Sequence, residues 1–506
     1  MPSTDTISRS AMAATSHPLA VASAVRCLEA GGNAADAAVC AAAVLCVVEP
    51  MSTGIGGDAF ALVWRDGDLT GLNASGRAPA AADPDALGPA MPFTGPQTVT
   101  VPGAVAGWQA LLERHGTWGL DRCLVDAIDA AASGFELTPV IAGAWERIAP
   151  DLAAYEEAAS VFLPPPAVGT TWRNPQLAAT LKRIAADGPD GFYRGPVAAA
   201  IASASWLEES DLAGMQADWV EPLRLSFGDA TVCELPPNGQ GAAALQAMGI
   251  ARDLDLGGLD DADRVHLQAE AMKLAFADAY RYIADEPLPA GYLDEAYLAT
   301  RRGQIDRTRA AHPGPGALPR GGTVYLTVVD GDRMACSFIQ SLYIGFGSRV
   351  VAPGTGVMLQ NRGACFTLEA GHPNRLAPGK RPFHTIIPGM LLDGAGDSLI
   401  GPFGLMGGHM QPQGHLQLLT NLRYRGLGPQ AALDAPRWRL DQDDEGWLLC
   451  LEPGLWDVAD ELERRGHRVW RDPEPTSYGG GQAIMLRGDE LVGGSEPRKD
   501  GLAAGY

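Results

Sequence analysis

A threonine that follows two glycines, Thr323 after Gly321 and Gly322, has the surroundings of a nucleophile. A threonine hydroxyl attacks poorly unless a base lies beside it. If the bond between Gly322 and Thr323 were cut, the new α-amine, with a pKa of about 7.7–8.0, would place that base on the same residue. The two glycines give the backbone the freedom that an internal N-to-O acyl shift needs. The alternative is an ordinary threonine that opens a strand after a flexible loop.

The residues after Thr323 predict a β-hairpin. The run 323–329 is rich in β-branched residues, and Asp330-Gly331 is a strong hairpin-turn signal. Pairing across that turn places Thr323 opposite Gln340, with Ser341 one step further. The hairpin therefore predicts a second hydroxyl close to the first.

Further segments can be placed by their capping and breaking residues. A helix is expected from His17-Pro18 to about Ala30, and Asn33 is expected to cap an almost wholly apolar helix over 34–48. That helix is shorter than the roughly 20 residues of a membrane span and is expected in the core. The Gly-rich loop 49–58 predicts a close backbone crossing. The Pro- and Gly-rich segment 310–322 predicts an exposed linker, typical of a released tail.

Bulk properties exclude several classes of protein. The 506 residues carry a net charge of −22, which argues against nucleic acid and membrane partners. The eight cysteines occur singly, as expected of reduced thiols, and the first residues have no signal-peptide pattern, so a cytoplasmic location is expected. His266 and Glu270 have the spacing of a metal pair, but no other His or Cys pair supports them. We expect neither a metal nor a cofactor.

Family-like motifs are spread along the chain, at residues 31–38, 49–58, 320–331, 379–388, 401–408, 478–481 and 493–501. Together they resemble the γ-glutamyltranspeptidase family of self-processing N-terminal nucleophile hydrolases, from Ala13 to Tyr506. The resemblance implies a four-layer αββα sandwich of the α/β class. It also implies cleavage into a large subunit, 1–322, and a small subunit, 323–506, which share one structural domain and can pair further as a dimer of heterodimers.

The resemblance also implies roles for individual residues. Thr323 would be the nucleophile and Ser341 would tune it, and the backbone N–H groups of Gly407 and Gly408 would form the oxyanion hole. Gly322 and Thr323 would flank the self-processing bond. The expected substrate-binding residues are Arg77, Tyr343, Arg362, Cys365, His384 and Thr385.

The chain departs from the family where a substrate would be bound. Cys365 stands where transpeptidases have an Asp that pairs with the glutamyl ammonium, and Arg362 stands where Gln or Glu is usual. His384 and Thr385 replace paired serines, and His384 could donate to a carboxylate or be a structural histidine. Arg77 is displaced by two positions from the family's carboxylate clamp, so a surface role is as good an interpretation. A pocket that lost a negative group and gained a positive one suits a substrate with a carboxylate and no amine.

These departures favour hydrolysis of a small carboxylate-bearing amide, as in the oxamate amidohydrolase branch, which stretches such as 359–363, 371–374 and 406–415 resemble most. The alternative within the same mechanism is a γ-glutamyltransferase or glutathione hydrolase. An acylase with a larger acyl group is a third, because residues 366–378 leave little room for a long lid. The rival of another class is an unprocessed binding protein that kept the fold.

Overall fold

The computed structural model describes residues 4–311 and 322–506, with Gly322 and Thr323 described by their backbone alone. Most of the predicted linker, 310–322, therefore lies outside the described residues. Two seven-stranded sheets dominate the fold, and every strand pair in them is antiparallel. In spatial order, the first sheet contains β1 (Thr6–Ser8), β20 (Glu490–Ser495), β19 (Gly480–Arg487), β15 (Leu399–Met406), β14 (Gly389–Asp393), β9 (Ala230–Glu234) and β8 (Leu223–Phe227). The second contains β21 (Leu502–Gly505), β2 (Met12–Thr15), β10 (Gly322–Val329), β11 (Ala335–Tyr343), β3 (Asp58–Arg65), β4 (Asp68–Ala74) and β7 (Asp218–Val220).

Helices cover the outer face of each sheet. Those on the side of the second sheet are α1 (Pro18–Glu29), α2 (Ala34–Val48), α3 (Ala104–His115), α4 (Leu120–Cys123), α5 (Val125–Ser133), α6 (Pro139–Leu152), α7 (Glu156–Phe162), α8 (Pro175–Asp187), α9 (Asp190–Tyr193), α10 (Gly195–Ala204) and α11 (Glu209–Ala213). Those on the side of the first sheet are α12 (Gly241–Ala251), α13 (Asp261–Tyr282), α14 (Glu295–Arg302), α15 (Met410–Arg423), α16 (Pro429–Asp434) and α17 (Ala459–Arg464). Smaller sheets pair β16 (Trp438–Asp443), β17 (Gly446–Leu451) and β18 (Arg468–Arg471), β12 (Val351–Ala352) with β13 (Val357–Met358), and β5 (Phe135–Glu136) with β6 (Thr171–Trp172).

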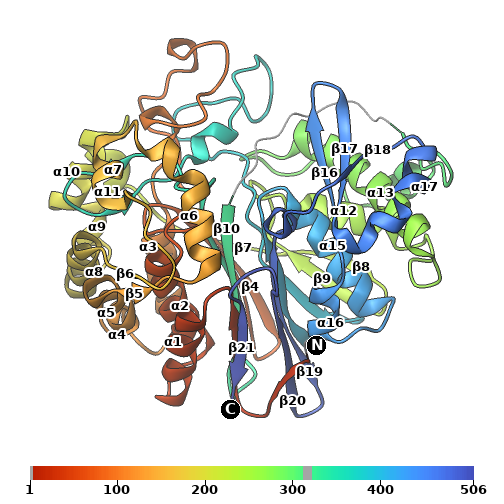
Figure 1. The fold of residues 1–506 in the computed structure, drawn as a ribbon, viewed down its shortest axis with the longest axis horizontal. Coiled ribbons are helices and arrows are strands. Elements are labelled where there is room, and N and C mark those ends of the chain that lie inside the picture. Colours follow the sequence, from red (N-terminus) through yellow and green to blue (C-terminus); the bar gives the residue numbers. More distant parts are fainter. Residues whose placement is uncertain (1–3, 312–321) are drawn as a thin grey trace.

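Three apolar cores separate the four layers. One lies between the sheets and joins Tyr325 of β10 and Ile339 of β11 to Met390 of β14 and Ile484 of β19. The others lie between each sheet and its helices. Figure 1 shows the strands between a red-to-yellow helical layer and a green-to-blue one. The predicted αββα sandwich is confirmed, since alternate residues of each central strand face the other sheet and the helices.

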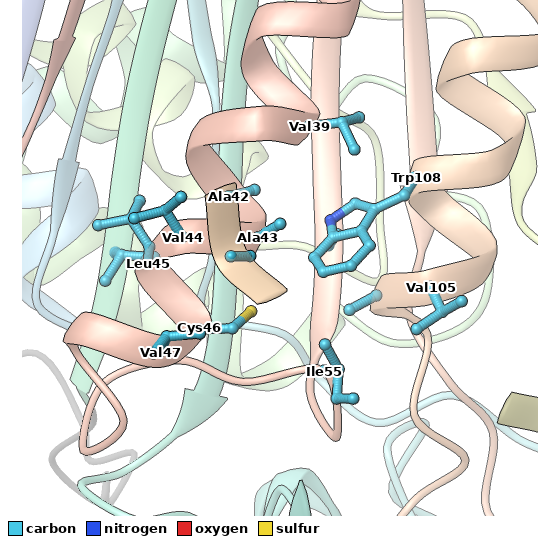
Figure 2. Close-up of a cluster of buried hydrophobic side chains, with 14 of the residues drawn as sticks. Val39, Ala42, Ala43, Val44, Leu45, Cys46, Val47, Ile55, Val105 and Trp108 are labelled. Carbon is cyan, nitrogen blue, oxygen red and sulfur yellow. The ribbon is translucent and has the colours of Figure 1, made fainter. Parts of the chain in front are cut away.

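The first two helices form as their capping residues predict. The His17 ring accepts a hydrogen bond from the N–H of Leu19 at the start of α1. Asn33 caps α2 through the N–H groups of Ala35 and Asp36, in a reciprocal capping box with Asp36. Every residue of α2 is buried, and Figure 2 shows part of its apolar surface against Trp108 of α3. This all-apolar helix is therefore a core element, as expected.

The register of the central hairpin differs from the prediction by one residue. Gln340 pairs with Val324 instead of Thr323, and Ala335 pairs with Val329. The reason is a wider loop: the Asp330 carboxylate accepts hydrogen bonds from the N–H groups of Asp332 and Met334. The ladder is also irregular between Gly322, which pairs with Tyr343, and Val324. Thr323 lies at that irregularity.

Both sheets contain strands from residues 1–322 and from residues 323–506, so the two halves share one set of cores. The eight cysteines all lie among the described residues and are free; seven are buried and Cys365 is partly exposed. Within residues 4–311 and 322–506, no helix has the length and apolar character needed to cross a membrane.

Candidate active site

The predicted nucleophile lies at the start of β10, in the middle of the second sheet. The residues of β11 between the partners of Gly322 and Val324 are Ser341 and Leu342. Ser341 is buried, and its hydroxyl accepts a hydrogen bond of 2.8 Å from the N–H of Tyr343. The fold therefore brings Ser341 to the backbone of Thr323, as the hairpin argument expected, although the exact pairing differs.

A close backbone crossing fixes the end of β11 against the loop that carries Arg362. A side chain on Gly57 would place its Cβ 2.2 Å from the Ser341 carbonyl oxygen, and one on Gly56 would lie 2.1 Å from that of Met358. The Gly56 carbonyl accepts a hydrogen bond from the N–H of Gln360. The crossing predicted for the Gly-rich loop 49–58 is confirmed, and the segment it crosses continues from Gln360 into the 3₁₀ turn η3 (Arg362–Cys365).

Arg362 is a buried cation with unused hydrogen-bond donors. Its guanidinium lies 4.4 Å from the centre of the Tyr343 ring, and Nη1 donates to the Thr385 hydroxyl at 2.9 Å. Nη1 also approaches the Cys365 sulfur at 3.9 Å. Among the described residues, Nε and Nη2 of Arg362 have no hydrogen-bond partner although the side chain is fully buried. A buried guanidinium edge of this kind matches a carboxylate, which accepts two parallel hydrogen bonds.

Asp58, at the start of β3, has its oxygens occupied by protein donors. Oδ1 accepts hydrogen bonds from the N–H groups of Gly76 and Gly103, each at 3.0 Å, and from Gln360 Nε2 at 2.9 Å. Oδ2 lies 3.1 Å from Nε2 of His384. These bonds tie β3 to the Gln360–Arg362 loop, so Asp58 serves the structure of the site.

His384 is held on both sides by the protein. Nε2 faces Asp58, and Nδ1 accepts from the N–H of Ile386 at 3.3 Å. Burial, and then the positive charge of Arg362, lower the pKa of His384 to about 3, so the ring is neutral at neutral pH. Of the two roles left open for His384, the contacts correspond to the structural one.

Thr385 and the Gly407-Gly408 turn are joined by a residue that the sequence analysis did not single out. Gln240, at the start of α12, donates from Nε2 to the carbonyl oxygens of Thr385 (2.5 Å) and Gly408 (2.9 Å). Because Thr385 also accepts from Arg362, the buried amide links the guanidinium to the glycine turn. Only the break at Pro236-Pro237-Asn238-Gly239, just before Gln240, marked this position in the sequence.

The two glycines at the head of α15 present free amide groups. Gly407 has φ 122° and Gly408 has φ 61°, backbone angles that favour glycine. Within the described part of the chain, no group accepts a hydrogen bond from either N–H. Both precede the positive end of the α15 dipole, where an anion is stabilised. The turn can therefore hold an oxyanion.

Gly407→Ala should impair catalysis through this turn. The new Cβ would lie 3.0 Å from the Gly479 Cα and 3.1 Å from the Met410 Cβ, so the turn must shift and its N–H groups with it. Loss of one oxyanion donor typically lowers kcat by about 10²–10³-fold, and KM should change little. Gly426→Ala is the matched control, since Gly426 also has a positive φ (66°) but open space around it. Equal losses of kcat in both variants would contradict an oxyanion role.

Arg77 lies in different surroundings from Arg362. Its side chain is 47% exposed, and it donates to the Gly379 carbonyl at 3.0 Å and pairs with Asp285 at 3.2 Å. It therefore corresponds to the surface role that the sequence left open. Cys365 is partly exposed, and burial raises the pKa of its thiol, with Arg362 opposing the shift. The thiol is neutral at pH 7.

The pair His266 and Glu270 gains a third neighbour, His467, that the sequence analysis missed. The Lys273 ammonium lies in the same cluster, 2.7 Å from Glu270 and 3.5 Å from His467. Glu270 and Lys273 also bind the N–H and carbonyl of Ala311. The positive charge of Lys273 would repel a metal ion at this position. The cluster instead holds the backbone at Ala311 through hydrogen bonds.

The four-layer αββα sandwich, with two antiparallel sheets between helical layers, is the fold of the N-terminal nucleophile hydrolases. The model of the gamma-glutamyltranspeptidase family matches residues 20–506. The chain therefore belongs to the gamma-glutamyltranspeptidase family, and the resemblance found in the sequence is confirmed.

Several relatives are similar over their whole length. The oxamate amidohydrolase proenzyme of Klebsiella pneumoniae is 36% identical, covering 99% of this chain and 99% of the relative. The glutathione hydrolase-like YwrD proenzyme of Bacillus subtilis is 34% identical, covering 98% of each. Among solved structures, cephalosporin acylase from Bacillus halodurans is 42% identical, with a TM-score of 0.94 over 100% of this chain and 97% of that one. All three are named as enzymes, and the chain is a hydrolase of their family.

Proposed function

We propose that this protein is a self-processing amidohydrolase that cleaves a carboxylate-bearing amide of the oxamate type, with Thr323 as the nucleophile. The observation that carries the proposal is Arg362, a fully buried guanidinium whose Nε and Nη2 lack a partner among the described residues. Buried donors without partners are costly, and a substrate carboxylate would satisfy both at once. The oxamate amidohydrolase among the relatives supports the same substrate class.

The surroundings of Arg362 disfavour the alternative γ-glutamyl substrate. The α-ammonium of a γ-glutamyl substrate would meet the Arg362 guanidinium instead of an anion, because Cys365 carries a neutral thiol. The Asp58 carboxylate already accepts bonds from Gly76, Gly103, Gln360 and His384. An ammonium without an anionic partner in a buried pocket is expected to cost several kcal/mol.

The proposed reaction uses an acyl-enzyme. The Thr323 hydroxyl adds to the amide carbonyl while the α-amine of the same residue takes its proton, and the N–H groups of Gly407 and Gly408 hold the oxyanion. The C–N bond then breaks, and the amine leaves with that proton. Water, activated by the same α-amine, hydrolyses the ester and restores Thr323. Arg362 holds the substrate carboxylate throughout.

The same threonine is proposed to cut its own chain. Attack of the Thr323 hydroxyl on the Gly322 carbonyl converts that amide to an ester, which water hydrolyses to give subunits 1–322 and 323–506. The relatives named as proenzymes support processing of this kind. Because each sheet pairs strands of one half with strands of the other, the two subunits would stay together after cleavage.

Substrate preference tests the proposed function. In the mature protein, kcat/KM for oxamate should exceed that for a γ-glutamyl anilide by at least roughly 100-fold, from about 3 kcal/mol of unpaired charge. Release of ammonia and of the aniline chromophore measures the two rates. A preference for the anilide would overturn the role given to Arg362 and support the glutathione hydrolase alternative.

A further inference from the structure

A cavity of about 810 Å³ lies beside the proposed carboxylate site. Its inner lining includes the buried residues Tyr343, Phe383 and His409, and the exposed residues Ala90 and Glu369 lie at its rim. Tyr343 and Cys365 both line the cavity and both contact Arg362, at 4.4 Å from the ring centre and 3.9 Å from the sulfur. A carboxylate on Arg362 would therefore lie next to the cavity.

The cavity is much larger than oxamate requires. Oxamate has only two carbon atoms, whereas pockets of roughly 300–1,000 Å³ hold drug-sized ligands. The short segment between Phe366 and Pro378 leaves the cavity open on one side, and Thr367, Leu368 and Glu369 form part of its wall. A natural substrate that fills this space extends well beyond its carboxylate and amide.

The lining shows what kind of group would fit. The His409 ring stacks on Phe383 (20° between planes) and meets the Tyr280 ring edge-on (83°). The charged residues of the lining, Arg281 and Glu369, are both exposed. The inner part is therefore aromatic and uncharged, which suits a flat, neutral group.

Two residues that line the cavity carry polar atoms with no hydrogen-bond partner among the described residues. Both ring nitrogens of His409 and the hydroxyl of Tyr280 are buried. None of these three atoms makes a hydrogen bond to the described residues. Burial lowers the pKa of His409 to about 3, so its ring is neutral and offers one donor and one acceptor. A ligand hydroxyl beside these groups would satisfy them.

We propose that the cavity binds an uncharged aromatic group bearing a hydrogen-bonding substituent, carried by the same substrate whose carboxylate Arg362 holds. This inference rests on the proposed function and narrows its substrate class to aryl-substituted carboxylate amides. Oxamate itself would then occupy only the carboxylate end of a larger site.

Binding of three 2-oxo acids to the mature protein, measured by calorimetry, tests the inference without relying on turnover. Pyruvate carries the carboxylate alone, phenylpyruvate adds the ring, and 4-hydroxyphenylpyruvate adds a hydroxyl. We expect phenylpyruvate to bind at least roughly ten-fold tighter than pyruvate, from the apolar area it buries. The hydroxyl should add about five-fold more, from a net hydrogen bond near 1 kcal/mol.

Variants separate the ring from its substituent. Ala277→Trp, which fills the cavity from α13, should abolish the gain of phenylpyruvate over pyruvate. Tyr280→Phe and His409→Phe should each abolish the gain from the hydroxyl. Tyr292→Phe is the matched control, since Tyr292 also buries a hydroxyl without a partner among the described residues but does not line the cavity. It should keep both gains.

Two outcomes overturn the inference in distinguishable ways. If Arg362→Gln weakens pyruvate binding but phenylpyruvate binds no better than pyruvate to the wild type, the cavity is not an aryl subsite and the proposed function stands. If pyruvate binds equally to the wild type and Arg362→Gln, the proposed carboxylate site is wrong and the inference fails with it.

Discussion

Thr323→Ala should leave one intact chain of 506 residues and reduce amide hydrolysis on the order of 10⁴- to 10⁶-fold, the loss typical when a catalytic nucleophile is removed. The substitution removes the hydroxyl for both proposed reactions, self-cleavage and substrate attack. It should not unfold the chain, because alanine is compatible with a strand and the uninterrupted pairing with β11 begins at Val324. A denaturing gel, intact mass and amino-terminal sequencing measure the cleavage.

Two further variants control for this result. Thr323→Ser keeps the hydroxyl and should still give a fragment that begins at residue 323. Thr327→Val changes a buried threonine four positions along the same strand and should cleave normally. Cleavage of Thr323→Ala at the same bond would exclude Thr323 as the attacking residue. A wild type that is fully active as one uncut chain would refute the mechanism altogether and favour an unprocessed protein.

Arg362→Gln should lower kcat/KM for oxamate by roughly 30- to 5,000-fold, which corresponds to about 2–5 kcal/mol for truncating one partner of a buried charge pair. The glutamine can still bond to the Thr385 hydroxyl but cannot neutralise a carboxylate. Arg362→Lys keeps the charge but loses the planar pair of donors. Its kcat/KM for oxamate should therefore lie between those of the wild type and Arg362→Gln. Steady-state kinetics on each variant measure the effect.

The converse change makes the test sharper. Arg362→Gln combined with Cys365→Asp removes the cation and supplies the anion that a substrate ammonium needs. The double variant should lose activity on oxamate and gain activity on a γ-glutamyl anilide, each relative to the wild type. Arg77→Gln is the matched control at an exposed arginine already paired with Asp285, and it should change kcat/KM for oxamate little. An Arg77 variant as impaired as the Arg362 variant would show that the carboxylate is held elsewhere.

The parts of the fold that follow local rules were predictable. Asn33 and Asp36 specify the start of α2 through their own side chains, and an unbroken apolar run specifies a helix buried on every side. The Gly-rich loop 49–58 predicted a crossing, and a Cβ on Gly56 or Gly57 would collide with the backbone of Met358 or Ser341. The residues that start α2 are neighbours in the chain, and the crossing is indicated by glycines, which have no side chain.

The division of roles among the site residues was not predictable in the same way. The sequence left His384 open between binding a substrate and supporting the structure, and its contact with Asp58, 326 positions away, corresponds to support. The role of Gln240 was not predicted, because no neighbouring residue indicates that its amide reaches Thr385 and Gly408. The hairpin register moved by one residue because the Asp330 side chain holds a wider loop.

By itself, the sequence determined the four-layer class, the family, the threonine at the head of a strand and the exchange of charge at positions 362 and 365. Those features depend on residue types and their spacing along the chain. Only the tertiary structure decided that the Arg362 guanidinium keeps two donors unused, that Arg77 is paired at the surface, and that a neutral aromatic cavity adjoins the site. The physical reason is that hydrogen-bond partners and empty space are properties of segments that meet only when both sheets and their helices have packed.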